Sequence, residues 1–237
     1  MIADPAKWNF ASPTFPVSPS SVFDLTPVAL WCRFLKAAVR GFAFGRALHR
    51  GTSEALTVLT VTMNDRAAKM LGVRGGFDSL DPEMGLVPGL RKWVDGGIEC
   101  RGEVVCWRPA PPHADDAPAR SFDLTGWECT HTSFHLEDFV PVESTNVDGP
   151  IIGVDAQRIL LRQGVALARE VVRLAGELHP PIPLRCITGT NETNGVFRFH
   201  RIRPEETWLA DDLDGYDEDA LVVLDFHPRP DSPASNI

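Results

Sequence analysis

The sequence predicts an α+β fold with a largely antiparallel β-sheet. Short segments rich in β-branched residues recur along the chain, two longer segments have the spacing of amphipathic helices, and an Asn-Gly dipeptide separates two strand-like segments. All of residues 1–237 are expected to form a single domain. The proline-rich segment 108–120 is interpreted as a surface loop rather than a linker, because each flanking half is only moderately rich in core-forming residues.

Two principal helices are predicted, at about residues 27–43 and 155–178. Thr26 is a suitable N-cap for the first helix, and a proline follows it at the first helical position. The second helix places its apolar residues on one face and mainly arginines on the other. Asp155 caps its start, and a proline pair stops it after residue 178. A shorter helix is predicted to follow Asn64 and to end near Leu71.

The strands are predicted from β-branched runs and from alternation of apolar and polar residues. Both faces of segment 54–63 carry apolar residues, so this strand is expected in the centre of the sheet. Asn194-Gly195 favours a tight reversal, which predicts a hairpin at this position. The predicted strands are residues 54–63, 98–107, 121–129, 133–142, 184–190, 196–203 and 220–226.

Three segments are predicted to be irregular. Residues 11–21 are rich in proline and serine and are interpreted as an extended N-terminal arm. Residues 72–89 are rich in glycine, and 108–120 contain four prolines and no large apolar residue.

Charge and composition favour a cytoplasmic protein that binds neither nucleic acid nor membranes. The pI is near 5.2, whereas phosphate backbones and anionic lipids require a basic surface. The N-terminus lacks the charged and apolar regions of a signal peptide, and no apolar run is long enough to span a bilayer. The five cysteines are scattered without CxxC spacing, as is typical of reduced thiols.

The net negative charge lies in one stretch, Pro204–Phe226, called here the acidic segment. It contains nine carboxylates and no Lys or Arg. Removing these nine from the 32 acidic residues leaves 23, which equals the number of Lys and Arg residues. Such a concentration of like charge is interpreted as an attractive surface for a basic partner. The predicted contact residues are Asp211, Asp212, Asp214, Asp217, Glu218 and Asp219, together with Trp208 or Tyr216.

The neighbouring strand has the opposite charge. Arg198, Arg201 and Arg203 are expected to pair with carboxylates of the acidic segment and to hold it in place. Asp212–Gly215 is similar to part of a calcium loop, but Ala210 and Leu221 occupy positions that need oxygen ligands, which argues against calcium.

A second candidate site lies at Cys129–Asp138, where His131, His135 and Glu137 are possible zinc ligands. On the predicted strand, however, the two histidines would lie about 13 Å apart. No HExxH, GxSxG, P-loop or GxGxxG motif occurs, and no cofactor is expected.

The sequence therefore predicts a binding protein that neutralises a basic protein partner, in the manner of an immunity protein or inhibitor. A metal-assisted hydrolase using His131, His135 and Glu137 is the alternative from the enzyme class. A structural or assembly subunit is a third hypothesis, suggested by the arm at 11–21.

Overall fold

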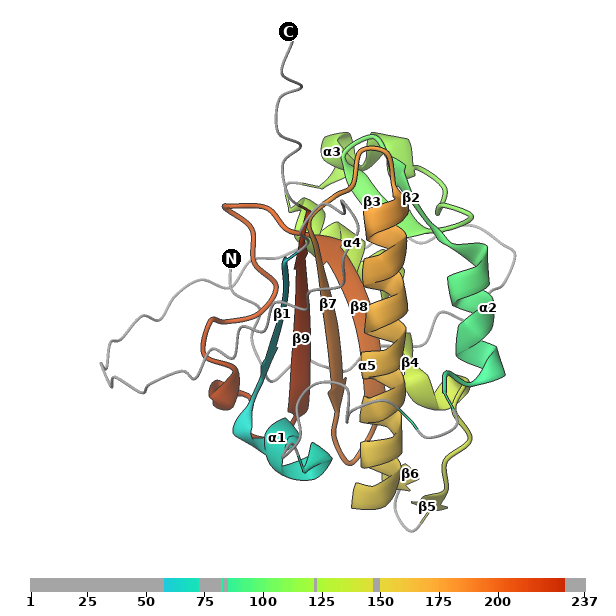
Figure 1. Cartoon of the computed structure of the whole chain (residues 1–237), viewed down its shortest axis with the longest axis vertical. Coiled ribbons are helices and arrows are strands. Elements are labelled where there is room, and N and C mark those ends of the chain that lie inside the picture. The colour runs from blue at the N-terminus through green and yellow to red at the C-terminus, as the bar shows by residue number, and fades with distance from the viewer. Residues whose placement is uncertain (1–57, 73–81, 83–84, 122, 147–149, 229–237) are drawn as a thin grey trace, which may run out of the picture.

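The computed structural model describes residues 58–72, 82, 85–121, 123–146 and 150–228 (Figure 1). The helix predicted at 27–43 and the arm at 11–21 lie outside these residues. The described part has an α+β fold, in which helices pack against an antiparallel five-stranded sheet. Two small two-stranded sheets accompany the main one.

The main sheet has the strand order β1-β9-β7-β8-β4, and every neighbouring pair is antiparallel. Its central strands confirm the predicted hairpin and the predicted C-terminal strand. Asn191 N donates to Asn194 O (2.9 Å) in the hairpin turn. The strands are β1 (Val58–Met63), β4 (Phe134–His135), β7 (Leu184–Thr190), β8 (Gly195–Arg201) and β9 (Ala220–His227).

The prediction of a central strand at 54–63 was wrong for its described part. β1 lies at an edge of the described sheet. Val61 and Met63 pack against the core, but Val58 and Leu59 are 58% and 37% exposed. The apolar residues of this strand therefore reflect partial burial of Val61 and Met63 near its C-terminal end, while the rest of the strand is exposed.

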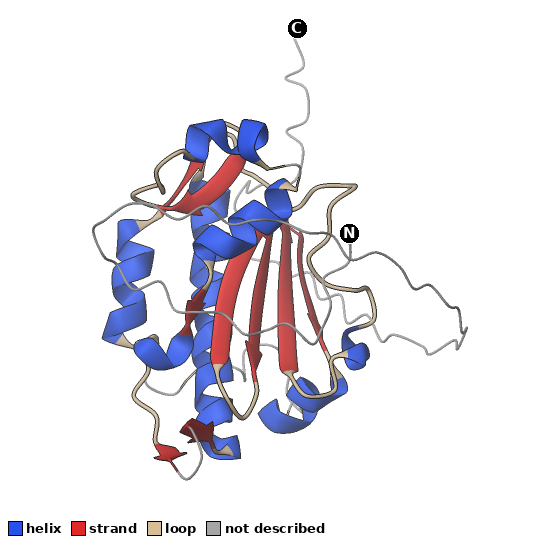
Figure 2. Ribbon diagram, turned by 180° about the vertical axis from the view of Figure 1, so that it is seen from behind, coloured by secondary structure: helices blue, strands red, loops and turns tan. Residues whose placement is uncertain are grey.

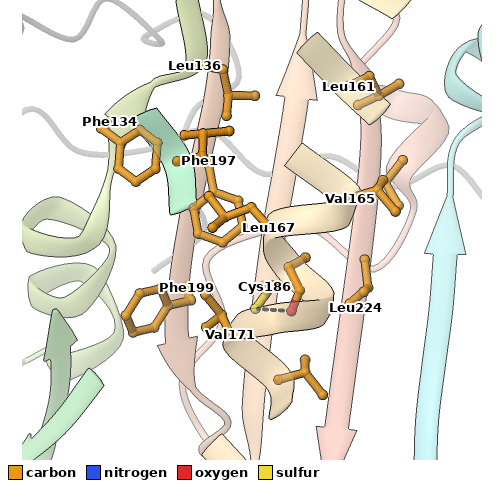
Figure 3. Packing of buried hydrophobic residues seen from close by; sticks show 14 of the residues in the cluster. Phe134, Leu136, Leu161, Val165, Leu167, Val171, Cys186, Phe197, Phe199 and Leu224 are labelled. Carbon is orange, nitrogen blue, oxygen red and sulfur yellow. Dashed lines mark hydrogen bonds between the residues drawn. The ribbon is translucent and has the colours of Figure 1, made fainter. Parts of the chain in front are cut away.

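Helix α5 (Val154–Glu177) confirms the longest predicted helix and covers one face of the sheet (Figures 1 and 3). Cys186 on β7 lies beneath it, and its thiol lies 3.8 Å from Ala168 O. A Cβ at Gly164 would lie 2.0 Å from Thr188 Oγ1, so glycine is required where helix and strand approach most closely. The residues drawn in Figure 3 include Leu161, Val165, Leu167, Val171, Phe197, Phe199 and Leu224.

Four predictions that involve residues 88–142 need correction. The loop prediction for 72–89 ended too late, because α2 begins at Pro88 and buries Leu90 and Val94 on one face. The strand predicted at 98–107 is a hairpin that turns at Gly102, with φ of 58°. These elements are α2 (Pro88–Gly96), β2 (Ile98–Arg101) and β3 (Val104–Trp107).

The strand predicted at 121–129 was also wrong, because this region forms helix α4 (Leu124–Thr132). The Asp123 side chain caps the helix by accepting from Gly126 N (2.8 Å). Of the strand predicted at 133–142, the two residues of β4 are extended, and a 3₁₀ turn, η4 (Leu136–Asp138), follows them.

The remaining elements are short. Residues 108–113 form a loop, as predicted, but the second half of the predicted loop, residues 114–120, forms two short helical turns. The helix predicted after Asn64 is confirmed as α1. These elements are α1 (Asp65–Leu71), η3 (Ala114–Asp116), α3 (Ala117–Arg120), β5 (Ser144–Asn146), β6 (Pro150–Ile152) and η5 (Leu213–Gly215). Among the helices of the described residues, none has the length and apolar character needed to cross a membrane.

Helix α4 closes the outer edge of β8 beyond β4. Thr132 Oγ1 accepts from Phe199 N (3.0 Å) and donates to Phe199 O (2.7 Å). One helical turn earlier, Glu128 Oε2 accepts from Arg201 N (2.8 Å). Two side chains of a helix thereby satisfy backbone groups that a further strand would otherwise bind.

Candidate acidic interface

The connection from β8 to β9, residues 202–219, crosses the sheet face that α5 does not cover. Figure 2 views the sheet from that side. Ile187 lies on this face because its neighbours Cys186 and Thr188 face α5. Apolar residues of the connection form a second, smaller core with the sheet. This core consists of Leu209, Leu213, Tyr216, Ile187, Leu221 and Val223, with Trp208 and Ala210 packed against it.

The buried side chain of Asn64, which follows β1, fixes the path of the connection. Asn64 Nδ2 lies 2.7 Å from Asp219 O, 3.3 Å from Tyr216 O and 3.5 Å from Leu213 O. Its Oδ1 accepts from Ala67 N and from Leu221 N, both at 3.0 Å. The side-chain amide of Asn64 therefore caps α1 and orients the connection. It also accepts a hydrogen bond from Leu221, near the start of β9.

Five of the predicted contact carboxylates are exposed to solvent. Asp212 Oδ1 accepts from Asp214 N (3.1 Å), and Asp214 Oδ1 accepts from Asp65 N (2.8 Å). The other three have neither a hydrogen bond nor an ion pair with any residue that the structure describes. The five are Asp211, Asp212, Asp214, Asp217 and Glu218.

Of the other four carboxylates in the acidic segment, Glu205 is exposed, and the remaining three are engaged within the protein. Asp219 is partly buried and accepts from Asn191 Nδ2 (2.8 Å), and burial raises the pKa of its carboxyl. Asp225 forms two hydrogen bonds of 2.7 Å with Arg185. Glu206 lies 3.8 Å from Arg203, so one of the three predicted arginines pairs with the segment as expected.

The two aromatic residues of the acidic segment differ in accessibility. Tyr216 is 5% exposed in the second core, and its hydroxyl accepts from Ala210 N (3.0 Å). A partner cannot reach its ring, so Tyr216 is removed from the predicted contact. Trp208 is partly buried, and the guanidinium carbon of Arg198 lies 5.2 Å from its ring centroid. Burial lowers the pKa of Arg198 to about 10.

The candidate metal ligands lie on three successive structural elements, α4, β4 and η4. His131 is exposed on α4 and stacks on Trp127 at 3.9 Å between ring centroids. His135 ends β4, and its Nδ1 lies 3.1 Å from Glu137 Oε1. Glu137 Oε2 in turn accepts from Gly195 N (2.9 Å). Within the described ranges, no group of three or more His, Cys, Asp or Glu side chains is arranged to hold a metal ion.

The sequence analysis missed the buried ion pair between Glu128 and Arg203. The Glu128 carboxylate accepts from Arg203 Nη1 (2.7 Å) and Nη2 (2.9 Å), and from Val105 N (2.7 Å). Burial raises the pKa of Glu128, and these donors oppose that shift. Because α4 was interpreted as a strand, no pattern in the sequence indicated that this carboxylate faces inward.

Comparisons with known proteins place the chain in one family. A search of curated proteins found no match, and a search of solved structures found none either. The sequence profile of the Uncharacterized protein PM0498 family matches residues 77–232. This match covers more than half of the chain and contains the whole acidic segment. The chain therefore belongs to the Uncharacterized protein PM0498 family.

Proposed function

We propose that this protein is an intracellular binding protein that neutralises a basic protein partner through its acidic segment, in the manner of an immunity protein or inhibitor. One observation carries the proposal. Asp211, Asp212, Asp214, Asp217 and Glu218 are exposed on a connection whose backbone is anchored by Asn64 and by buried apolar side chains.

Anchoring is important because a flexible acidic loop would lose conformational entropy on binding. Here that ordering has already taken place during folding, so the carboxylates can act as a fixed patch of negative potential. Such a patch attracts a basic surface from a distance and raises the association rate, most strongly at low salt. Trp208 lies beside the patch and offers an apolar contact at its rim.

The cations of α1 limit the extent of the patch. Arg66 and Lys69 are exposed, and Arg66 Nη1 lies 3.4 Å from Asp217 O. We therefore place the centre of the contact at Asp211, Asp217 and Glu218, whose carboxylates have no described partner.

The test is a triple variant, Asp211→Asn, Asp217→Asn and Glu218→Gln, which removes three charges without removing a hydrogen bond seen in the structure. The partner is first captured from native cell lysate at about 50 mM and about 300 mM salt. Association of the purified pair is then measured by stopped flow. We expect the triple variant to associate about tenfold more slowly at the lower salt concentration.

A matched control removes the same number of charges elsewhere. Asp95→Asn, Asp138→Asn and Glu143→Gln change exposed carboxylates near α2 and η4, on the opposite side of the molecule in Figure 1. We expect this control to slow association less than about twofold, because screening at about 50 mM salt weakens interactions beyond a Debye length of about 14 Å. If the first triple variant associates as fast as the wild type, the proposed function is wrong.

The hydrolase and assembly-subunit hypotheses stay predictions from the sequence. The hydrogen bond between His135 and Glu137 is compatible with a ligand pair, but His131 belongs to another element. Elemental analysis of the purified protein decides the first: stoichiometric zinc or iron that is lost in His135→Ala would favour the hydrolase.

A further inference from the structure

The outer edge of β1 carries backbone groups that point away from the sheet. Asn64 N donates to Leu221 O (3.2 Å), which fixes the phase of the antiparallel pairing between β1 and β9. Counting back in steps of two, Thr62 and Thr60 direct their backbone groups toward β9. The alternate residues of the strand, Leu59, Val61 and Met63, direct their backbone N–H and C=O groups outward.

This edge is open among the residues that the structure describes, because no described strand pairs with it. Val58, Leu59, Thr60 and Thr62 are exposed. The strand sequence VLTVTM contains no proline or lysine, which are residues that commonly protect an edge strand. The edge therefore has the features of a strand that accepts another strand.

Two of the exposed carboxylate residues, Asp214 and Asp217, lie near the C-terminal end of the same strand. Asp214 Oδ1 accepts from Asp65 N (2.8 Å), one residue after Asn64. Asp217 O is contacted by Arg66. A chain that paired with β1 would therefore run toward the negative patch, so cationic residues in that chain would be favoured.

We propose that the edge of β1 binds an extended, basic segment of the protein partner as an added strand, with the lysines or arginines of that segment on the acidic connection. This inference rests on the proposed function and names the form of the partner. Backbone hydrogen bonds to Leu59, Val61 and Met63 supply affinity, and the carboxylates select for positive charge.

The probe is a synthetic nonapeptide in which lysine alternates with valine and threonine. We expect the amides of Leu59, Val61 and Met63 to exchange rapidly in the free protein and at least tenfold more slowly with the peptide bound. Those of Thr60 and Thr62 should be protected in both states. This alternating pattern, read by NMR hydrogen exchange, distinguishes strand pairing from attraction by charge alone. A nonapeptide with glutamate in place of lysine should change nothing.

The matched variants are Leu59→Pro and Leu59→Thr. Proline removes the outward N–H at a position that donates no bond to β9, whereas threonine retains it. We expect Leu59→Pro to raise the peptide Kd at least tenfold and Leu59→Thr less than threefold. If thermal denaturation shows that Leu59→Pro does not fold, a peptide N-methylated at alternate residues replaces it, and its binding to the wild type should be lost.

Several outcomes would overturn the inference. One is protection of the Leu59, Val61 and Met63 amides in the free protein, since the edge would then be occupied already. Another is absence of peptide binding at a peptide concentration of about 1 mM, which would detect even a weak complex. If Leu59→Pro binds like the wild type, charge alone holds the peptide, and this inference fails while the proposed function stands. The proposed function fails separately, if neutralising Asp211, Asp217 and Glu218 leaves association with the captured partner unchanged.

Discussion

The two edges of the main sheet differ in how their outward backbone groups are covered. At the β8 edge, Thr132 and Glu128 of α4 bind the outward backbone groups of Phe199 and Arg201. At the β1 edge, the described residues provide no such cover, and Leu59 is 37% exposed. An edge strand can be protected by a covering helix or left available for pairing. Among the described residues, the first holds at one edge and the second at the other, and this difference is the basis of the proposed strand pairing.

The largest expected effect comes from breaking the closed edge at its ion pair. Arg203→Leu leaves Glu128 as a buried carboxylate without a counter-charge, and should lower the free energy of unfolding by about 3–5 kcal/mol in urea denaturation. Arg101→Leu is the control, because the ion pair of Arg101 with Asp115 (3.0 Å) is largely exposed. This substitution should lower the free energy of unfolding by less than about 1 kcal/mol.

The pH dependence of this variant gives a second measurement. The pKa of Glu128 is already raised by burial, and removal of Arg203 should raise it further. A carboxyl with a raised pKa destabilises the fold above that pKa, since ionisation in the buried site is unfavourable. The difference in unfolding free energy between the wild type and Arg203→Leu should therefore become smaller as the pH falls below neutrality. A difference that stays constant from pH 7 to pH 4 would contradict this account of the pair.

His200 allows the closed-edge strand to be tested without disrupting α4. Burial lowers its pKa from 6.5 to about 4, and Arg185 and Arg203 add to this effect while Asp225 opposes it. Between these pH values the unfolded chain binds a proton that the folded protein does not bind. Stability should therefore be lost as the pH falls through this window, by up to roughly 3 kcal/mol.

In His200→Gln this contribution is absent, so its unfolding free energy should depend less steeply on pH than that of the wild type. The measurement is urea denaturation at intervals from pH 7.5 to pH 4. Parallel curves for the two proteins would exclude His200 as the source of acid sensitivity.

The smallest effects compare one substitution at both edges. Thr132→Val keeps the shape of a fully buried side chain but leaves the N–H and C=O of Phe199 without their partner, and should cost about 2 kcal/mol. Thr60→Val changes an exposed side chain on β1 and should alter stability by less than about 0.5 kcal/mol. Equal thermal stabilities for the two variants would mean that α4 does not close its edge through Thr132.

The sequence predicted those elements whose signals are local. Helix α5 has a long amphipathic period, and the turn of the β7–β8 hairpin is closed locally, because Asn191 Oδ1 accepts from Thr193 N and Asn194 N. Neither element therefore depends on distant contacts. The region of α4 was predicted as a strand, and its Thr, Trp and Cys residues have low helix propensity. Its helical form is favoured by tertiary contacts, since Glu128 and Thr132 must lie one turn apart to reach Arg201 and Phe199.

Prediction of the candidate site was limited in the same way. The acidic segment could be located by composition, and its most concentrated carboxylates are exposed in the structure. The burial of Tyr216 could not be predicted, because it depends on the sheet face across which the connection runs. The role of Asn64 was equally hidden, since its carbonyl partners lie about 150 residues further along the chain.

The single amide of Asn64 has a consequence for native-state dynamics. Because it joins the end of β1, the first turn of α1 and the β8–β9 connection, none of these can open without breaking hydrogen bonds of the others. They should behave as one foldon with a common opening free energy, although they come from opposite ends of the described chain. A ligand seated on the connection would then slow the local unfolding of α1, a helix that it does not touch.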